Sequence, residues 1–261
     1  MRILVTNDDG IMAPGIEALY RAVADLGHVD VVAPESPQSA VGHAISIRTP
    51  LLAHRVQVGQ AFEGWAVQGS PADCVKLAMK ELLEAPPDFV LSGINHGANT
   101  GINVLYSGTV AGASEGAFFG TPAIAFSQEL SDVLDFEKAR VVARGIFQRF
   151  ASSRPPRGMC LSVNIPSCDK GWPLGVRCVP MALAPMEDAY RKQFDELGRV
   201  HYWLDGDWPD HRDHPESDLE AIHERYVSIT PLRFQLTDER QLNEIRGWGW
   251  PQDFAATESG K

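Results

Sequence analysis

Two adjacent carboxylates follow the first apolar run of the sequence. Residues 3–5 (ILV) predict a short buried strand, and Asp8 and Asp9 come soon after it. In an open α/β sheet the ligand crevice lies at the carboxyl ends of the strands, so the pair is well placed to meet a substrate. Neighbouring carboxylates repel each other, and a hard divalent cation holds both ionised. Gly10 lets the chain turn after the pair with a positive φ if required. The pair favours a metal site over the alternative, in which the two residues only cap the next helix or form a turn.

Two further polar segments follow predicted strands. The loop at residues 35–49 holds Ser39 and His43 as candidate functional groups, and the strand at residues 89–91 continues into the glycine-rich residues 92–99 (SGINHGAN). Taken singly, a loop serine or histidine is usually only solvated, and a glycine-rich stretch is an ordinary tight loop. Because parallel strands end at one edge of a sheet, we expect these segments to lie beside the carboxylate pair.

A helix of small residues is predicted at residues 107–116, beginning at Ser107, Gly108 and Thr109. Small side chains allow such a helix to pack closely on the sheet. Its N-terminus offers free N–H groups and a favourable dipole to an anion. The alternative is that the serine or threonine is a routine N-cap.

The order of the predicted elements indicates an α/β fold. A strand, a helix and a second strand open the chain, which is the unit that right-handed crossovers build into a parallel sheet. We expect a Rossmann-like, mostly parallel sheet flanked by helices, with a smaller C-terminal extension or arm. Strands are expected at residues 3–5, 29–33, 65–68, 89–91, 123–126, 160–165 and 226–230, and helices at residues 16–26, 71–82, 107–116 and 136–150.

A proline-rich stretch at residues 154–158 (RPPRG) is typical of a linker. Residues 1–158 are expected to form a Rossmann-like catalytic core. Residues 159–261 are expected to supply the remaining sheet strands, a flap loop and a C-terminal oligomerisation arm.

The C-terminal part contains an acidic stretch and two tryptophans. Residues 205–218 (DGDWPDHRDHPESD) predict a surface loop or flap. His211 and His214, with Asp210 and Asp213, are potential metal ligands, but their spacing fits no established metal site, so we interpret the stretch as a solvated loop. Trp248 and Trp250 suit burial at a subunit contact better than exposure to solvent.

The composition is that of a globular protein and excludes several partners. The 261 residues are 44% hydrophobic and 22% charged, and the formal net charge is −11. This balance argues against a nucleic-acid polymer or an anionic membrane, which need a cationic face. A small anionic substrate requires a local offset such as a bound metal. No apolar run is long enough to span a bilayer and the chain opens directly on a strand, so we expect a cytoplasmic protein.

The cysteines show no CxxC pairing, so neither a zinc ribbon nor a thioredoxin-type motif is indicated. In a reducing compartment we expect free, mostly buried thiols. The four residues are Cys74, Cys160, Cys168 and Cys178.

Several motifs in order carry a family likeness. They are VTNDDG followed by Ala13-Pro14-Gly15, Pro34 with Gln38-Ser39, residues 69–75 (GSPADCV), SGINHGAN, residues 106–116 (YSGTVAGASEG) and residues 227–232 (VSITPL). Together they resemble the SurE family, the stationary-phase survival protein E nucleotidases. The likeness covers the first lobe, returns at residues 227–232 and is loose between them.

The resemblance implies a metal-dependent phosphomonoesterase that acts on nucleoside 5′- and 3′-monophosphates, some members also trimming short polyphosphate. It implies one Mg²⁺ or Mn²⁺ per subunit, and a homodimer or homotetramer with an exchanged C-terminal arm. The family's metal ligands fall on Asp8, Asp9, Ser39 and Asn95, which are hard oxygen donors. Its phosphate-binding residues fall on Ser107, Gly108 and Thr109, and Asn99 falls on a position expected to face substrate.

Two departures from the family pattern stand out. Ala40 follows the ligand serine where many members have glycine, which matters only if φ at this position is positive. Residues 110–112 read Val-Ala-Gly instead of the usual Val-Gly-Ala, so the helix under the phosphate could sit slightly differently. His96 is variable in such proteins and is assigned no role.

The mechanism expected from these groups is direct hydrolysis by a metal-activated water, with Asp8, Asp9 and Asn95 as the catalytic residues. The metal polarises a phosphate oxygen, and hydroxyl groups and helix amides stabilise an in-line transition state. Asp8 or Asp9 orients or deprotonates the water, and the sequence does not distinguish between them.

Three alternatives remain to be weighed. A nicotinamide-dependent dehydrogenase would need GxGxxG in the first turn, which carries carboxylates instead. A phosphatase with an aspartyl nucleophile expects two aspartates separated by one residue, whereas Asp8 and Asp9 are adjacent. A non-enzymatic, Mg²⁺-binding receiver module is much shorter and needs an accepting aspartate where this chain has residues 92–95 (SGIN).

Overall fold

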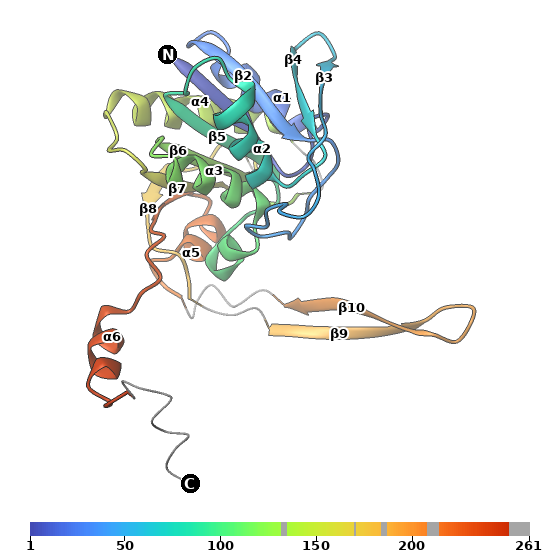
Figure 1. The fold of residues 1–261 in the computed structure, drawn as a ribbon, viewed down its shortest axis with the longest axis vertical. Coiled ribbons are helices and arrows are strands. Elements are labelled where there is room, and N and C mark those ends of the chain that lie inside the picture. The colour runs from blue at the N-terminus through green and yellow to red at the C-terminus, as the bar shows by residue number, and fades with distance from the viewer. Residues whose placement is uncertain (132–134, 170, 184–186, 208–213, 251–261) are drawn as a thin grey trace, which may run out of the picture.

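One nine-stranded sheet organises the chain, in the order β3-β4-β2-β1-β5-β6-β7-β11-β8 (Figure 1). The computed structural model describes residues 1–131, 135–169, 171–183, 187–207 and 214–250. The sheet strands are β1 (Arg2–Thr6), β2 (His28–Pro34), β3 (Ala53–Val58), β4 (Phe62–Val67), β5 (Phe89–His96), β6 (Ala123–Gln128), β7 (Cys160–Ile165), β8 (Val176–Cys178) and β11 (Val227–Leu232). The helices are α1 (Pro14–Val23), α2 (Pro71–Leu77), α3 (Gly108–Phe118), α4 (Phe136–Ser152), α5 (Asp218–His223) and α6 (Glu239–Arg246), with a π-helical turn η1 (Ala78–Leu82) and a 3₁₀ turn η2 (Gly101–Leu105).

The sheet is mostly parallel, which confirms the predicted fold class. Strands β4, β2, β1, β5, β6 and β7 are parallel neighbours, whereas β3 and β11 pair antiparallel with β4 and β7. In the paired register Val5 lies between Val31 and Leu91. Strands β2, β1 and β5 therefore end at the same edge. The sheet continues from β6 to β7 across the linker-like residues 154–158.

Helices cover both faces of this sheet, so its central strands are buried along nearly their whole length. Helices α1 and α4 pack on one face, where Ile16, Leu19 and Phe147 join the core. Helices α2 and α3 pack on the other, where Cys74 and Val110 are buried. Every residue from 108 to 117 of α3 is buried, because its small side chains let it lie directly on the sheet. The N-terminus of α3 is thereby fixed beside the end of β1.

The structure differs from the sequence predictions at several elements. Helix α1 ends at Val23, not at residue 26. Strand β3 and the antiparallel pair β9 (Glu187–Phe194) and β10 (Val200–Asp207) were not predicted. The predicted loop at residues 205–218 is wrong at both ends, because residues 205–207 complete β10 and Asp218 begins α5. Asp210, His211 and Asp213 lie outside the described residues.

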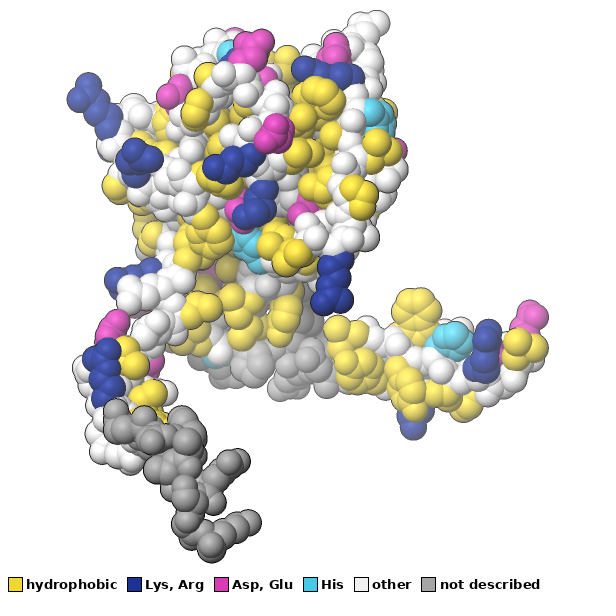
Figure 2. All heavy atoms as spheres, in the orientation of Figure 1, with side chains coloured by type: hydrophobic (Ala, Val, Ile, Leu, Met, Phe, Trp, Pro, Cys, Tyr) yellow, Lys and Arg dark blue, Asp and Glu magenta, His cyan; other side chains and the backbone are white. Residues whose placement is uncertain are grey.

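The pair β9–β10 extends away from the sheet and carries apolar side chains along its length (Figures 1 and 2). Helix α6 extends on another side, where Trp248 and Trp250 are exposed. Exposed apolar surfaces of this kind are typical of interaction sites. A contact between subunits at these elements stays a prediction.

Two other sequence expectations bear on the class of protein. Cys74, Cys160 and Cys168 are buried and Cys178 is exposed, and all four thiols are free, which confirms the prediction of mostly buried free cysteines. In the part of the chain that the structure describes, no helix combines the length and the apolar character needed to cross a membrane.

Candidate active site

One cavity of about 630 Å³ lies at the edge where β1 and β5 end. Most of the predicted site residues line this cavity, although they come from four separate segments of the chain. The lining includes Asp8, Asp9, Ser39, Asn95, Asn99 and Ser107. The parallel order of the strands thus brings the predicted polar segments together.

Asp8 is held firmly from the side of α3. Its carboxylate is buried, and Thr109 Oγ1 donates a hydrogen bond to Asp8 Oδ1 at a distance of 2.5 Å. Gly108 packs directly against it, because a Cβ at this position would lie 2.8 Å from Asp8 Cβ. The backbone oxygen of Asp8 accepts a hydrogen bond from Gln38 N at 2.7 Å, which ties the end of β1 to the next loop.

Asp9 is more open and is oriented by the end of β5. Its Oδ2 accepts a hydrogen bond from the backbone N–H of His96 at 3.1 Å. The turn after it needs Gly10, whose φ of 97° lies in the region that favours glycine. The Gly10 carbonyl accepts a hydrogen bond from Asn7 Nδ2 at 2.9 Å, which closes the turn.

Both carboxylates are destabilised as anions in this setting. Burial raises the pKa of Asp8 to about 6, an effect that the Thr109 hydrogen bond opposes and the charge of Asp9 increases. Burial also raises the pKa of Asp9, against the opposing contacts with His96. Within the described ranges, no lysine or arginine contributes to the pKa of either group. The pair therefore has negative charge that a cation would neutralise.

Asn95 presents its carbonyl oxygen. Its Nδ2 donates to the Gly97 carbonyl at 2.8 Å, which leaves the Oδ1 end of the amide for a ligand. The pairing of β5 with β6 shifts register between Ser92 and Asn95, and such an irregularity re-aims a side chain at the end of a strand.

Asn99 is held in place by the neighbouring strands. Its backbone N–H donates to Asn164 Oδ1 at 2.7 Å, and its Nδ2 donates to Ser127 Oγ at 2.8 Å. The sequence analysis did not identify Asn164 or Ser127 in this role. Each of these two residues is polar and lies at or near the end of a predicted buried strand, which is the sequence feature that could have indicated the role.

The predicted phosphate-binding residues divide into two groups. Ser107 lines the cavity and is the N-cap of α3, its Oγ accepting from Val110 N at 3.1 Å, so its own proton stays available to a phosphate. Gly108 and Thr109 lie behind Asp8, and the Thr109 hydroxyl already donates to that residue. The backbone N–H of Thr109 also faces the Asp8 carboxylate and lowers its pKa, so the backbone N–H of Gly108 is the group that remains for an anion in the first turn of α3.

The loop after β2 contributes Ser39 and Ala40 to the cavity. Ala40 has a φ of 55°, in the region that favours glycine. The alanine at this position, where many family members have glycine, is therefore strained. His43 lines a different, apolar cavity next to α3, and its ring contacts Glu115 instead of Asp8 or Asp9.

An apolar wall completes the cavity and was missed by the sequence analysis. Ile102 and Tyr106 form one part, near η2, and Tyr190 and Leu204 form another from the hairpin β9–β10. Tyr190 and Leu204 are directly paired across the two strands. No local motif connects this hairpin with the N-terminal segments, so only the three-dimensional arrangement shows it.

A hard cation fits this set of groups. No group of three or more histidine, cysteine, aspartate or glutamate side chains suited to a metal occurs among the described residues. A cation beside Asp8 and Asp9 would therefore draw further oxygen ligands from Ser39 and Asn95, both of which line the same cavity. Such oxygen donors suit Mg²⁺ or Mn²⁺.

Comparison with known proteins decides the family. The family model described as "Survival protein SurE" matches residues 3–188. The chain belongs to the SurE family. A SurE relative from Rhodopirellula baltica, named "5'-nucleotidase SurE", is 45% identical over 249 residues, which cover 95% of this chain and 98% of the relative. Another with that name, from Syntrophobacter fumaroxidans, is 41% identical and the match covers 95% and 99% of the two chains.

The fold agrees with that of a solved SurE structure. The crystal structure of the SurE protein from Aquifex aeolicus matches with a TM-score of 0.81 and 35% sequence identity. The match covers 94% of this chain and 98% of the Aquifex chain. The resemblance seen in the sequence motifs is thus confirmed.

Proposed function

We propose that this SurE chain is a metal-dependent nucleotidase that hydrolyses nucleoside 5′- and 3′-monophosphates. The observation that carries the proposal is the pair Asp8 and Asp9, two carboxylates with raised pKa beside the N-terminus of a buried helix. The names of the close relatives support the same reaction class. Short polyphosphate, which has no base, would use only the polar part of the cavity.

Asp8, Asp9, Ser39 and Asn95 would hold one Mg²⁺ or Mn²⁺ per subunit. The cation supplies Lewis-acid polarisation of a phosphate oxygen and makes water a better nucleophile at neutral pH. The carbonyl end of Asn95 suits this task, because its Nδ2 already donates to Gly97.

The remaining chemistry is assigned to groups of the chain. The Ser107 hydroxyl and the backbone N–H of Gly108, at the start of α3, bind the phosphate oxygens, and Thr109 keeps Asp8 in one orientation. A carboxylate oxygen of Asp8 or Asp9 takes the proton of the attacking water. The water's hydroxyl joins phosphorus as the bond from phosphorus to the nucleoside oxygen breaks in line. The protonated carboxylate then returns its proton to that oxygen, which leaves as the alcohol.

The apolar wall supports a nucleoside as the leaving group. Ile102, Tyr106, Tyr190 and Leu204 line the same cavity as the carboxylates, so a base and a phosphate fit within one space. Aromatic faces stack on any base, which favours a broad range of nucleotides. The exposed hairpin and α6 support assembly as a homodimer or homotetramer, which we include in the proposal.

The direct test is phosphate release from 5′-AMP and 3′-AMP with Mn²⁺, before and after chelation. We expect release that depends on the metal and returns when metal is restored. A protein that binds Mg²⁺ and leaves both nucleotides intact would favour the receiver-like module. A phosphoenzyme trapped on Asp8 would replace direct attack by water with an aspartyl nucleophile.

A further inference from the structure

The loop that carries Ser39 has no buried residue to hold it. Every residue from 36 to 50 is exposed or only partly buried. A segment with few buried apolar contacts opens locally at low cost, so its position depends on polar contacts. Ser39 can take part in the site only if these contacts keep the loop over the end of β1.

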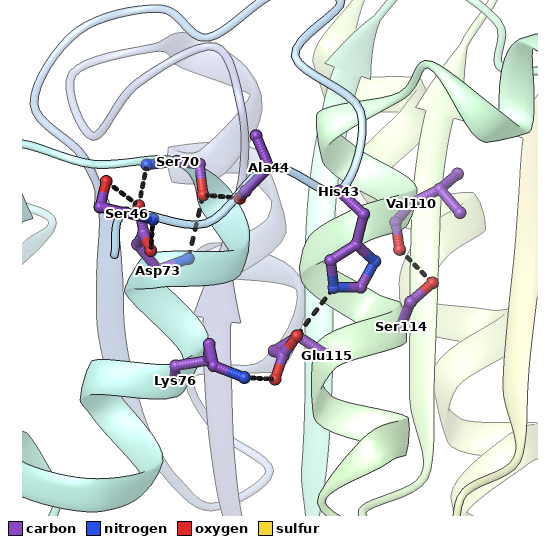
Figure 3. A network of polar contacts seen from close by, with 9 residues as sticks. All are labelled: His43, Ala44, Ser46, Ser70, Asp73, Lys76, Val110, Ser114 and Glu115. Atoms are coloured by element: carbon purple, nitrogen blue, oxygen red, sulfur yellow. Dashed lines mark hydrogen bonds and ion pairs between the residues drawn. The ribbon is translucent and has the colours of Figure 1, made fainter. Parts of the chain in front are cut away.

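The far end of the loop is tied to α2 through Asp73. Asp73 accepts hydrogen bonds from Ser46 N and from Ser46 Oγ, each at 2.8 Å (Figure 3). The same carboxylate accepts from Ser70 N at 3.0 Å as part of the capping box that begins α2. A helix cap therefore also serves as an anchor for the loop.

A second contact lies closer to Ser39 and reaches α3. His43 Nε2 lies 2.7 Å from Glu115 Oε2, and Lys76 Nζ lies 2.7 Å from Glu115 Oε1 (Figure 3). An ionised carboxylate only accepts hydrogen bonds, so His43 Nε2 carries the proton. Burial opposes ionisation of Glu115, but the contacts with His43 and Lys76 outweigh it and lower the pKa of Glu115.

Two features make the His43 contact well defined. The Glu115 side chain is only 4% exposed, so its hydrogen bonds are shielded from competing water. The His43 ring also stacks on Phe118, with ring centroids 5.2 Å apart and an interplanar angle of 13°. Both partners belong to α3, the helix that also positions Asp8 through Thr109.

From this geometry we propose that His43 is a positioning residue. Its hydrogen bond to Glu115 holds the loop, and with it Ser39, in place relative to α3, the helix that also holds Asp8 through Thr109. The inference rests on the proposed function for the role of Ser39. Backbone bonds from Gln38 N to the Asp8 carbonyl and from Gly42 N to the Tyr106 carbonyl guide the loop on either side. The His43 contact adds a side-chain anchor beside the one that Asp73 forms with Ser46, and it ties the loop directly to α3.

The chain offers a matched set of variants for a test. His43→Ala removes the anchor, whereas His43→Gln keeps an amide N–H in a position to donate to Glu115. Lys76→Met removes the other 2.7 Å partner of Glu115 without changing the loop. Ser46→Ala removes one of the two bonds from Ser46 to Asp73 and leaves the backbone bond.

Hydrogen exchange of the segment 36–50 in metal-free protein and Mn²⁺ affinity by calorimetry are the first readouts. For His43→Ala we expect about tenfold faster exchange in this segment and about tenfold weaker Mn²⁺ binding. The Mn²⁺ concentration that half-saturates AMP hydrolysis should rise in parallel, with kcat at saturating Mn²⁺ within about twofold of wild type. In His43→Gln both the exchange rate and the Mn²⁺ affinity should return most of the way to wild type. Ser46→Ala should change them less than His43→Ala does. Lys76→Met should leave exchange of the segment unchanged.

Unchanged exchange and Mn²⁺ affinity in His43→Ala would overturn the proposal. So would equal loss in His43→Gln and His43→Ala, because the hydrogen bond would then not be the cause. Loop exchange equally fast in Lys76→Met would show a general loss of stability instead of a specific anchor. If no variant hydrolyses AMP, the proposed function fails, and exchange and Mn²⁺ binding still decide the role of His43.

Discussion

Thr109 Oγ1 donates a hydrogen bond to Asp8 Oδ1 at a distance of 2.5 Å, although the two residues are 101 positions apart in the chain. The bond joins the end of a central strand to the first turn of the helix that would bind the phosphate. A hydroxyl has one proton, so Thr109 cannot use its side chain as a donor to Asp8 and to a substrate together. Its role is to hold the carboxylate.

Thr109→Val should therefore reduce turnover through Asp8. The variant keeps the shape of the side chain but leaves the buried carboxylate without its donor, and bonds to charged groups contribute about 1.5–3 kcal/mol. We expect kcat/KM for AMP to fall about 10- to 100-fold and the acid limb of the pH profile to move to higher pH, since the lost bond lowers the pKa of Asp8. Thr109→Ser should recover most of the loss. A Val variant with wild-type rates would contradict this role.

Asp8→Asn should separate activity from stability. We expect loss of phosphatase activity with the fold intact, as judged by circular dichroism. In the metal-free protein the pKa of Asp8 is raised by burial from 3.8 to about 6. Between pH 3.8 and about pH 6 the folded state keeps the Asp8 proton that the unfolded chain has released. The free energy of unfolding therefore falls as the pH rises through this range, and the whole decrease is present above about pH 6.

The same variant should therefore be more stable than wild type without metal at pH 7–8. The gain is at most about 3 kcal/mol from the pKa difference, and it should vanish below the ordinary pKa of aspartate. Urea unfolding at several pH values measures it. Added Mn²⁺ should stabilise wild type and not the variant, because only binding to the folded state raises stability. Equal stabilisation of both proteins by Mn²⁺ would place the cation elsewhere.

Tyr190→Ala tests whether the hairpin contacts the base. Stacking of an aromatic side chain on a base contributes about 1–3 kcal/mol, so we expect KM for AMP to rise roughly 5- to 100-fold. Ribose 5-phosphate, which has no base, should be hydrolysed as by wild type. Tyr202→Ala is the matched control, because Tyr202 is exposed on the partner strand and does not line the cavity. Equal losses on both substrates would exclude a contact with the base.

Ala40→Gly should stabilise the loop that carries Ser39. The φ of 55° at Ala40 costs an alanine about 1–2 kcal/mol. Glycine removes this cost, but it also makes the unfolded chain more flexible, which offsets part of the gain. We expect a gain in the free energy of unfolding of up to about 1 kcal/mol, measured by urea unfolding. Ala44→Gly, in the same loop without a positive φ, should be neutral or destabilising. A destabilised Ala40→Gly variant would contradict the account.

The sequence allowed the main part of the site to be predicted because of parallel strand order. Asp8 and Asn95 follow local apolar runs, and neighbouring parallel strands must end at one edge. Tyr190 could not be predicted in this way, since its place depends on a hairpin that begins far along the chain. The use of the Thr109 hydroxyl was equally hidden, because an N-terminal helix motif does not reveal which hydroxyl is already engaged.

The two sides of the proposed metal site differ in mechanical character. Asp8 follows a strand buried on both faces, whereas Ser39 belongs to a surface loop without any buried residue. A change in ionic radius can then be absorbed by a small displacement of the loop while the sheet stays as it is. Tolerance toward more than one divalent ion is the expected result, and exchanging the loop between homologues is a route to altering that preference.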